Sequence, residues 1–280
     1  MTAGLKALSE SAAVIDLSRR GRIRVTGEDR ARLLHAMSTN HVEGMKPGNS
    51  QYTFFLNAQG QIQADAYVLC FEDHFLLDVE PEVRQSLYEH LDHFIIADDV
   101  TLEDVTDQMP CFAIEGPRAE ADAAAISFTG ERGFRIYGTA APEGLPTATI
   151  EDAEAARIMH FKPRYGNDIT DRSLPQETQQ MKSAVHFQKG CYLGQEIVER
   201  VRSRGHVNRV LVGFTGDADA APAVGAKVAY GGKEDGDVTS AVVVDGKLYG
   251  LAIVRSQIAK PGTLVGIEGR PATLVAPWGA

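Results

Sequence analysis

The sequence predicts an α+β protein made of two mixed α/β units and a C-terminal all-β domain. Between residue 22 and about residue 160, runs that alternate like β-strands are interleaved with runs that repeat apolar residues at helical spacing. From Val210 onward the helical spacing stops, and short β-like runs follow one another between glycine-rich turns. The length of 280 residues suits roughly two domains and is compatible with one to three.

The first unit is expected over residues 1–105. RIRVTG (22–27) predicts a strand, and GEDRARLLHAM (27–37) predicts a helix with its leucines and methionine on one side. Residues 52–71 predict two strands around the hairpin loop Asn57-Ala58-Gln59-Gly60, whose Asn and Gly accept the left-handed conformations of a tight reversal. HFLLDVE (74–80) adds a strand, and a helix should follow from Pro81 to Phe94.

The second unit is expected over 106–207 and the last domain over 208–280. CFAIEGP and FRIYGT predict strands, and helices are expected from Arg118 to Ala125 and up to DAEAARIMH (152–160). The β-like runs after residue 207 are VLVGF, AKVAY, TSAVVVDG, LYGLAIV and ATLVAP. Their regular spacing favours a small barrel or a sandwich.

The composition excludes several classes of function. The formal net charge of −10 argues against nucleic-acid or membrane binding by the whole surface, because both need a broad cationic face. The three cysteines are odd in number and have no CxxC spacing, so neither a disulfide framework nor a metal site is predicted. No long apolar leader precedes the first unit, and we expect a cytoplasmic protein in a reducing compartment.

One basic segment stands out against this acidic background. Residues 182–209 contain six Lys or Arg and two Glu, a local charge of +6 − 2 = +4, so the rest of the chain carries −10 − 4 = −14. Such a segment can attract a small polyanion without making the whole surface cationic. The alternative is a solvated helix in which Glu196 pairs with Arg200 at i,i+4.

Cys191 lies inside this segment. If Gly190 breaks the chain and CYLGQEIVERV forms a helix, the thiol is near a helix N-terminus beside Lys189, and both features favour a reactive thiolate. The alternative is a buried, inert cysteine, which is what we expect for Cys70 and Cys111 in their apolar runs.

KGCYLGQE, followed by Arg200 and RSRGHVNR, resembles the signature of the YgfZ family of folate-binding proteins, relatives of the aminomethyltransferase (T-protein) of the glycine cleavage system. LNAQGQIQADAYV (56–68) is similar to the Asn-x-x-Gly hairpin of that family, and PRYGNDITDRSLPQE (163–177) to its central segment. The resemblance implies three domains around a central opening with a C-terminal β-barrel, the first two units being interleaved in some members.

The resemblance also implies a function and a site. It implies a tetrahydrofolate-binding accessory factor for the assembly or repair of iron–sulfur clusters in client enzymes, with folate and iron–sulfur client or assembly proteins as partners and Cys191 as the functional thiol. One thiol cannot hold a cluster alone, because ordinary clusters take four ligands. The residues expected to contact the folate are Asn57, Asp65, Tyr165, Lys189, Tyr192, Gln195, Glu196, Arg200 and Arg202.

Two departures from the T-protein pattern bear on the reaction. T-proteins carry two adjacent aspartates after the hairpin, and this chain has Ala64-Asp65. Met159 stands where those proteins place a glutamate that binds the pterin end. Aminomethyl transfer to tetrahydrofolate is therefore the alternative function, and a module that binds RNA or protein through residues 200–209 is a second alternative.

Overall fold

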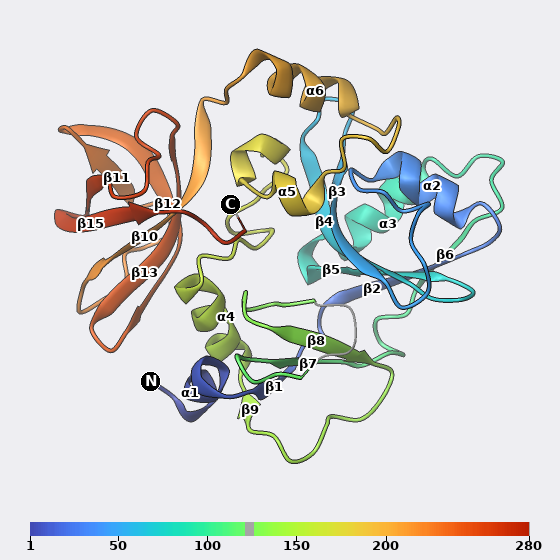
Figure 1. Ribbon diagram of the computed structural model, residues 1–280, viewed down its shortest axis with the longest axis horizontal. Coiled ribbons are helices and arrows are strands. Elements are labelled where there is room, and N and C mark those ends of the chain that lie inside the picture. Colours follow the sequence, from blue (N-terminus) through green and yellow to red (C-terminus); the bar gives the residue numbers. More distant parts are fainter. Residues whose placement is uncertain (121–125, 280) are drawn as a thin grey trace.

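The computed structural model describes residues 1–120 and 126–279. It contains two sheets with their helices and a separate C-terminal barrel (Figure 1). The predicted α+β class and the barrel are confirmed. The helix expected at Arg118–Ala125 falls mainly on residues outside the described part.

The first sheet has five antiparallel strands in the order β3-β4-β5-β2-β6. Its hairpin forms as predicted, and Asn57 accepts hydrogen bonds from the backbone N–H groups of Gln59 and Gln61 at 3.0 Å each. Helices α2 and α3 pack apolar residues against this sheet. The bounds are β2 Gly21–Thr26, α2 Arg30–Met37, β3 Ser50–Leu56, β4 Ile62–Cys70, β5 Phe75–Val79, the 3-10 turn Pro81–Val83, α3 Arg84–Asp92 and β6 Thr101–Asp104.

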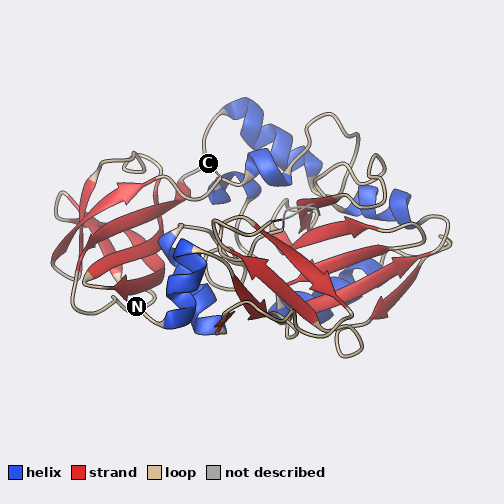
Figure 2. Ribbon diagram, turned by 60° about the horizontal axis from the view of Figure 1, so that its bottom comes forward, coloured by secondary structure: helices blue, strands red, loops and turns tan. Residues whose placement is uncertain are grey.

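The second sheet has the order β8-β7-β1-β9. Helices α1 and α4 lie between this sheet and the barrel (Figure 2). Thr149 caps α4 in a reciprocal capping box with Asp152, which fixes where that helix starts. The bounds are α1 Ala3–Glu10, β1 Ala13–Asp16, β7 Cys111–Glu115, β8 Gly133–Tyr137, β9 Thr147–Ala148 and α4 Ile150–Met159.

The two units are interleaved along the chain. β1 pairs with β7 and β9, so the N-terminal residues complete the sheet of the second unit. In the other direction, Tyr165, Val185, Tyr192 and Val198 pack in the core of the first unit. The packing therefore does not follow the linear division at residue 105.

Residues 160–208 connect α4 to the barrel, and the last helix of this connection, α6, lies at the top of the molecule (Figure 1). Helix α6 begins at Gln195 and not at Cys191, because Gly194 adopts a left-handed φ of 82° that cannot continue into a helix. A Cβ on Gly194 would lie 2.6 Å from the carbonyl oxygen of Asn57, so this close contact also requires glycine. The elements are the 3-10 turn η2 Pro175–Thr178, α5 Met181–Ala184 and α6 Gln195–Arg204.

Six antiparallel strands close the C-terminal barrel in the order β10-β13-β12-β11-β14-β15. Phe214, Leu248, Val254 and Leu274 are among the buried residues that fill it. The strands are β10 Arg209–Asp217, β11 Lys227–Tyr230, β12 Lys233–Val244, β13 Lys247–Arg255, β14 Leu264–Ile267 and β15 Arg270–Val275. Within the described residues, we find no helix with the length and apolar character needed to span a bilayer.

Candidate functional site

A cavity of about 350 Å³ lies where the three parts of the molecule meet. The first sheet contributes Tyr52, Asp65 and Tyr67, the second unit contributes Phe128, and the C-terminal tail contributes Trp278. Tyr52 faces Tyr67 across β3 and β4, and Tyr67 faces Asp78 across β4 and β5, so one row of polar and aromatic side chains crosses the sheet. Strand alternation thus places the side chains of Tyr52, Asp65 and Tyr67 on one face of the sheet.

Asp65 is the carboxylate of the sheet wall. It is 7% exposed and accepts a hydrogen bond from the Tyr52 hydroxyl at 2.6 Å. Burial, reinforced by the nearby charge of Glu80, raises the pKa of Asp65 to about 6, although the Tyr52 hydrogen bond opposes this shift. A carboxyl group that titrates so close to neutrality can accept or release a proton near physiological pH.

The opposite wall combines aromatic rings with a buried ammonium. Lys162 is 8% exposed, and its Nζ lies 4.8 Å from the centre of the Trp278 ring and 5.7 Å from that of Tyr67. The same Nζ donates to the Ser127 carbonyl and to the Tyr67 hydroxyl. Trp278 is fixed in turn by its Nε1–H, which donates to the Gly130 carbonyl at 2.9 Å. This wall offers flat apolar surface next to positive charge.

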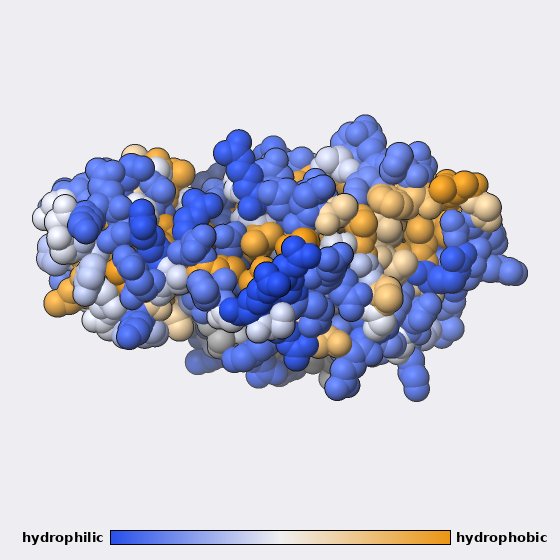
Figure 3. Space-filling view, turned by 90° about the horizontal axis from the view of Figure 1, so that it is seen from above, coloured by the Kyte–Doolittle hydropathy of each residue, from blue (hydrophilic) through white to orange (hydrophobic). Residues whose placement is uncertain are grey.

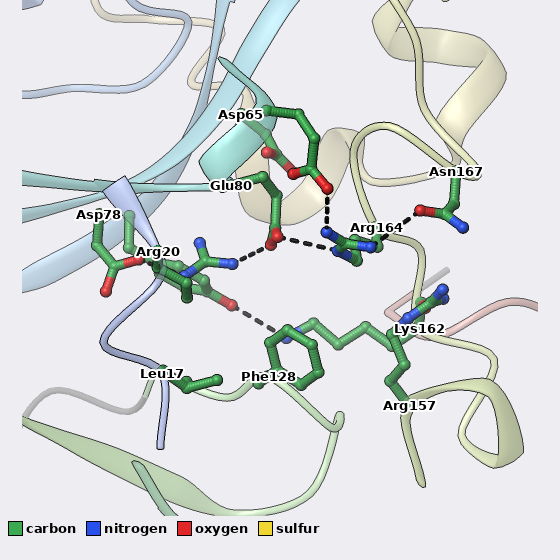
Figure 4. A network of polar contacts seen from close by, with 12 residues as sticks. Leu17, Arg20, Asp65, Asp78, Glu80, Phe128, Arg157, Lys162, Arg164 and Asn167 are labelled. Carbon is green, nitrogen blue, oxygen red and sulfur yellow. Dashed lines mark hydrogen bonds and ion pairs between the residues drawn. The ribbon is translucent and has the colours of Figure 1, made fainter. Parts of the chain in front are cut away.

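The floor of the cavity is a chain of ion pairs. Arg20 and Arg164 converge on Glu80, with Arg164 Nε 2.9 Å from Glu80 Oε2 (Figure 4). Arg164 also contacts Glu82 at 2.7 Å and Asn167 at 3.0 Å. Both arginines hold the pKa of Glu80 below its ordinary value in spite of its burial, so this carboxylate stays ionised.

The ion pairs continue between the two sheets at Asp78. This fully buried carboxylate of β5 contacts Arg20 and, from β8, Arg135 and the Tyr137 hydroxyl at 2.7 Å. The two guanidinium groups outweigh the effect of burial and hold the pKa of Asp78 well below its usual range. The contacts join the first sheet to the second directly beside the cavity.

A second buried pair joins the cavity to the barrel. Arg157 of α4 lies 2.9 Å from Asp168 and donates to the Ser240 hydroxyl at 3.2 Å. Asp168 also accepts hydrogen bonds from Thr239 and Ser240. Arg157 therefore orients the barrel against α4, and its guanidinium is already occupied by groups of the protein.

Among the residues predicted to form the site, Asp65 alone lines this cavity. Asn57 holds the hairpin loop, and the Tyr165 hydroxyl approaches the Ile62 carbonyl at 3.4 Å inside the first core. Arg200 pairs with Glu196 at 2.7 Å, and Arg202 lies 3.4 Å from Glu199 on the exposed surface of α6. Their role as folate contacts stays a prediction.

The residues around the predicted thiol form a separate group. Cys191 is exposed, whereas Cys70 and Cys111 are buried and their pKa values are raised by burial, that of Cys111 to about 12. Lys189 points away from solvent and donates through Nζ to the carbonyls of His35 and Ser38 at the end of α2.

Two further members of the predicted site support this loop. The ring of Tyr192 covers the Lys189 ammonium at 4.8 Å, and the Gln195 side chain accepts from the Tyr192 N–H at 3.3 Å. Burial lowers the pKa of Lys189 to about 8 and raises that of Tyr192 to about 12. The loop is thus held against α2 with the Cys191 thiol facing solvent.

Sequence reasoning missed most of the cavity lining. One signal was available: in the hairpin 52–71, strand alternation places Tyr67 on the same face as Asp65. Lys162 and Trp278 come from distant segments that meet only in the folded chain, and neither lies in a recognisable motif.

Comparisons with known proteins agree with this architecture. Residues 1–125 match the family described as the GCVT N-terminal domain. The aminomethyltransferase of Bacillus subtilis is 26% identical over 95% of this chain and 85% of its own length, and that of Lysinibacillus sphaericus is 28% identical over 94% and 84%. A chloroplastic protein of Arabidopsis thaliana that carries a transferase name is 27% identical over 93% of this chain and 69% of its own length.

Among solved structures, the glycine cleavage system aminomethyltransferase T from Bartonella henselae superposes with a TM-score of 0.84. The superposition covers 99% of this chain and 88% of that protein at 18% sequence identity. The chain therefore has the T-protein fold, and its similarities support a place in the T-protein-like superfamily.

Proposed function

We propose that the protein binds tetrahydrofolate or a related reduced folate in the central cavity, and that it serves iron–sulfur client proteins through the Cys191 thiol, as a YgfZ-type accessory factor. The lining of the cavity is the observation that supports folate binding. A folate is a flat heterocycle and a benzoyl ring joined to an anionic glutamate tail. The cavity has a matching combination of aromatic walls, one titratable carboxylate and several cations.

The position of Cys191 supports the proposed action on client proteins. Of the three cysteines in the chain, only Cys191 is exposed. It lies on a loop held by buried hydrogen bonds of Lys189, so the thiol is presented to a partner from a defined position. Because a single thiol supplies one ligand, a cluster or sulfur group would have to be shared with the client or with another thiol.

The aminomethyltransferases to which the chain is similar bear on the alternative reaction. Of the three acidic positions expected of such an enzyme, this chain keeps one as Asp65. The other two are replaced by Ala64, which is fully buried, and by Met159, which packs against the apolar core of the second unit. Neither side chain can accept or donate a proton. We therefore do not propose aminomethyl transfer for this chain.

Titration with tetrahydrofolate tests the proposed ligand. We expect saturable binding by calorimetry, weakened roughly fivefold by Trp278→Ala, because an aromatic contact contributes on the order of 1 kcal/mol. The matched control is Tyr230→Ala, a change at an exposed aromatic residue of the barrel outside the cavity lining, which should bind like the wild type. The double variant Arg200→Gln/Arg202→Gln distinguishes the two locations, because weaker binding in it would place the ligand at α6 and not in the cavity. Absence of binding by the wild-type protein would refute the folate assignment.

The affinity for tetrahydrofolate should depend on pH through Asp65. A ring N–H or amino group of the ligand favours the carboxylate form of Asp65, and the pKa of this group is raised to about 6. Affinity should therefore rise by roughly tenfold between pH 5 and pH 7, as the ionised fraction rises from about a tenth to about nine tenths. In Asp65→Asn, calorimetry at both pH values should show weaker binding without this increase. An identical increase in the variant would assign the titration to another group.

A further inference from the structure

The cationic side chains that line the central cavity differ in whether they already pair with carboxylates of the protein. Arg20 and Arg164 share Glu80, and Arg20 and Arg135 share Asp78. Arg157 is bound to Asp168 and Glu154. Each of these arginines therefore has carboxylate partners inside the protein and offers little free charge to a ligand.

Lys162 is occupied in a different way. Its ammonium donates to the Ser127 carbonyl and the Tyr67 hydroxyl and lies against two aromatic rings. These contacts satisfy most of its hydrogen-bonding capacity in a buried position.

Arg132 is the exception among the cavity cations. Its side chain is exposed, and over residues 1–120 and 126–279 the guanidinium makes neither a hydrogen bond nor an ion pair. The carboxylates of the cavity are already engaged, Asp65 by Tyr52, Glu80 by two arginines and Glu131 by His160 at 3.3 Å. The five donor N–H groups of Arg132 are thus available to an anion that enters from solvent.

The backbone that carries Arg132 is held in place. The buried carboxylate of Glu115 accepts from the backbone N–H groups of Phe128 and Thr129 and from the hydroxyls of Ser127 and Thr129. The Arg132 carbonyl accepts from the Gly116 N–H at 3.0 Å. An arginine on a segment fixed in this way loses little backbone entropy when it binds a ligand.

We infer that Arg132 binds the glutamate tail of the folate at the mouth of the cavity and thereby selects tailed folates over free pterins. This inference rests on the proposed folate site and adds the residue that recognises the anionic end of the ligand. A glutamate tail brings carboxylates, and the planar guanidinium can donate two parallel hydrogen bonds to one of them. Since Arg132 is exposed, the tail would remain near solvent while the rings enter the aromatic part of the cavity.

The test compares two ligands that share a ring system, tetrahydrofolate and 6-methyltetrahydropterin, which lacks the benzoylglutamate tail. Arg132→Gln should weaken tetrahydrofolate binding by roughly tenfold, in keeping with a charge-assisted contact close to solvent, and leave 6-methyltetrahydropterin binding unchanged. The tetrahydrofolate affinity of Arg132→Lys should lie between those of the wild type and Arg132→Gln, because lysine keeps the charge but lacks the planar guanidinium. Arg204→Gln, an exposed arginine of α6 outside the cavity lining, is the matched control and should change neither affinity.

The remaining outcomes separate this inference from the proposed function. If Arg132→Gln weakened the binding of both ligands equally, the arginine would support the cavity wall and would not contact the glutamate tail. An unchanged tetrahydrofolate affinity would assign the tail to another group. If the wild-type protein binds neither ligand, the proposed folate site is wrong and this inference is lost with it.

Discussion

Replacing Asp78 by alanine is expected to destabilise the protein by about 3–5 kcal/mol, the usual cost of removing one partner from a buried ion pair. The variant would leave the guanidinium groups of Arg20 and Arg135 buried without their shared carboxylate. It would also remove the acceptor of the Tyr137 hydroxyl. Urea denaturation at pH 7, followed by circular dichroism, measures the change in the free energy of unfolding.

The pH dependence of the free energy of unfolding gives a second measure of the contribution of Asp78. Because the pKa of Asp78 is lower in the folded protein than its usual value, its contribution is present above about pH 4 and is lost as the pH falls below that value. The Asp78→Ala variant should therefore lose less stability than the wild type between pH 5 and pH 3.

The matched control is Glu103→Ala on strand β6, which lies in the same sheet and is separated from β5 by β2. Glu103 forms an exposed pair with Arg24 at 3.4 Å, and such pairs contribute at most about 1 kcal/mol. If the two variants were equally destabilised, the cluster at Asp78 could not be the junction that holds the two sheets together.

The sequence predicted elements well where a short period repeats within one segment. The hairpin of residues 52–71, the helix after Pro81 and the β-runs beyond residue 207 all form. Strand β1 was not predicted, because its four residues are too few to show a period and its partner β7 lies almost one hundred residues away. The interleaving of the two units depends on the pairing of β1 with β7. Local sequence patterns do not report pairing between distant segments, so they could not predict the interleaving.

The candidate site was predictable only in part for a related reason. Asp65 belongs to a hairpin that the sequence shows, and it lines the cavity. The basic segment around Cys191 is locally conspicuous, yet its arginines pair with glutamates of their own helix. Lys162 and Trp278 reach the cavity through tertiary packing alone, which leaves no spacing signal in the sequence.

The structure thus separates two features that the sequence had placed together. The cavity proposed to bind the ligand is built by the sheets and the C-terminal tail, while the thiol lies on the loop that covers the end of α2. Figure 3 shows the face that bears α6, where hydrophilic residues gather near the middle and apolar residues lie beside them over the first unit. Phe187 adds exposed apolar surface close in sequence to Cys191 and is covered in part by Arg202, 3.9 Å from its ring.

This separation leads to the prediction for Cys191. Cys191→Ala should reduce the activity of a client iron–sulfur enzyme to the level of cells that lack the protein, because the other two cysteines are buried and cannot replace the thiol. Cys191→Ser should fail equally, since a hydroxyl neither carries sulfur nor exchanges with a thiol. The measurement is the activity of the client enzyme in cells that express each variant at equal abundance.

The same variants should keep their fold and their ligand. Cys191 is exposed, so its replacement should change the free energy of unfolding by less than about 0.5 kcal/mol. Tetrahydrofolate affinity should match the wild type, because the thiol does not line the cavity. Gln188→Ala, a change at an exposed residue of the same loop, serves as the control and should preserve client activity. Full client activity in Cys191→Ala would remove the thiol from the mechanism and leave folate binding as the function to be explained.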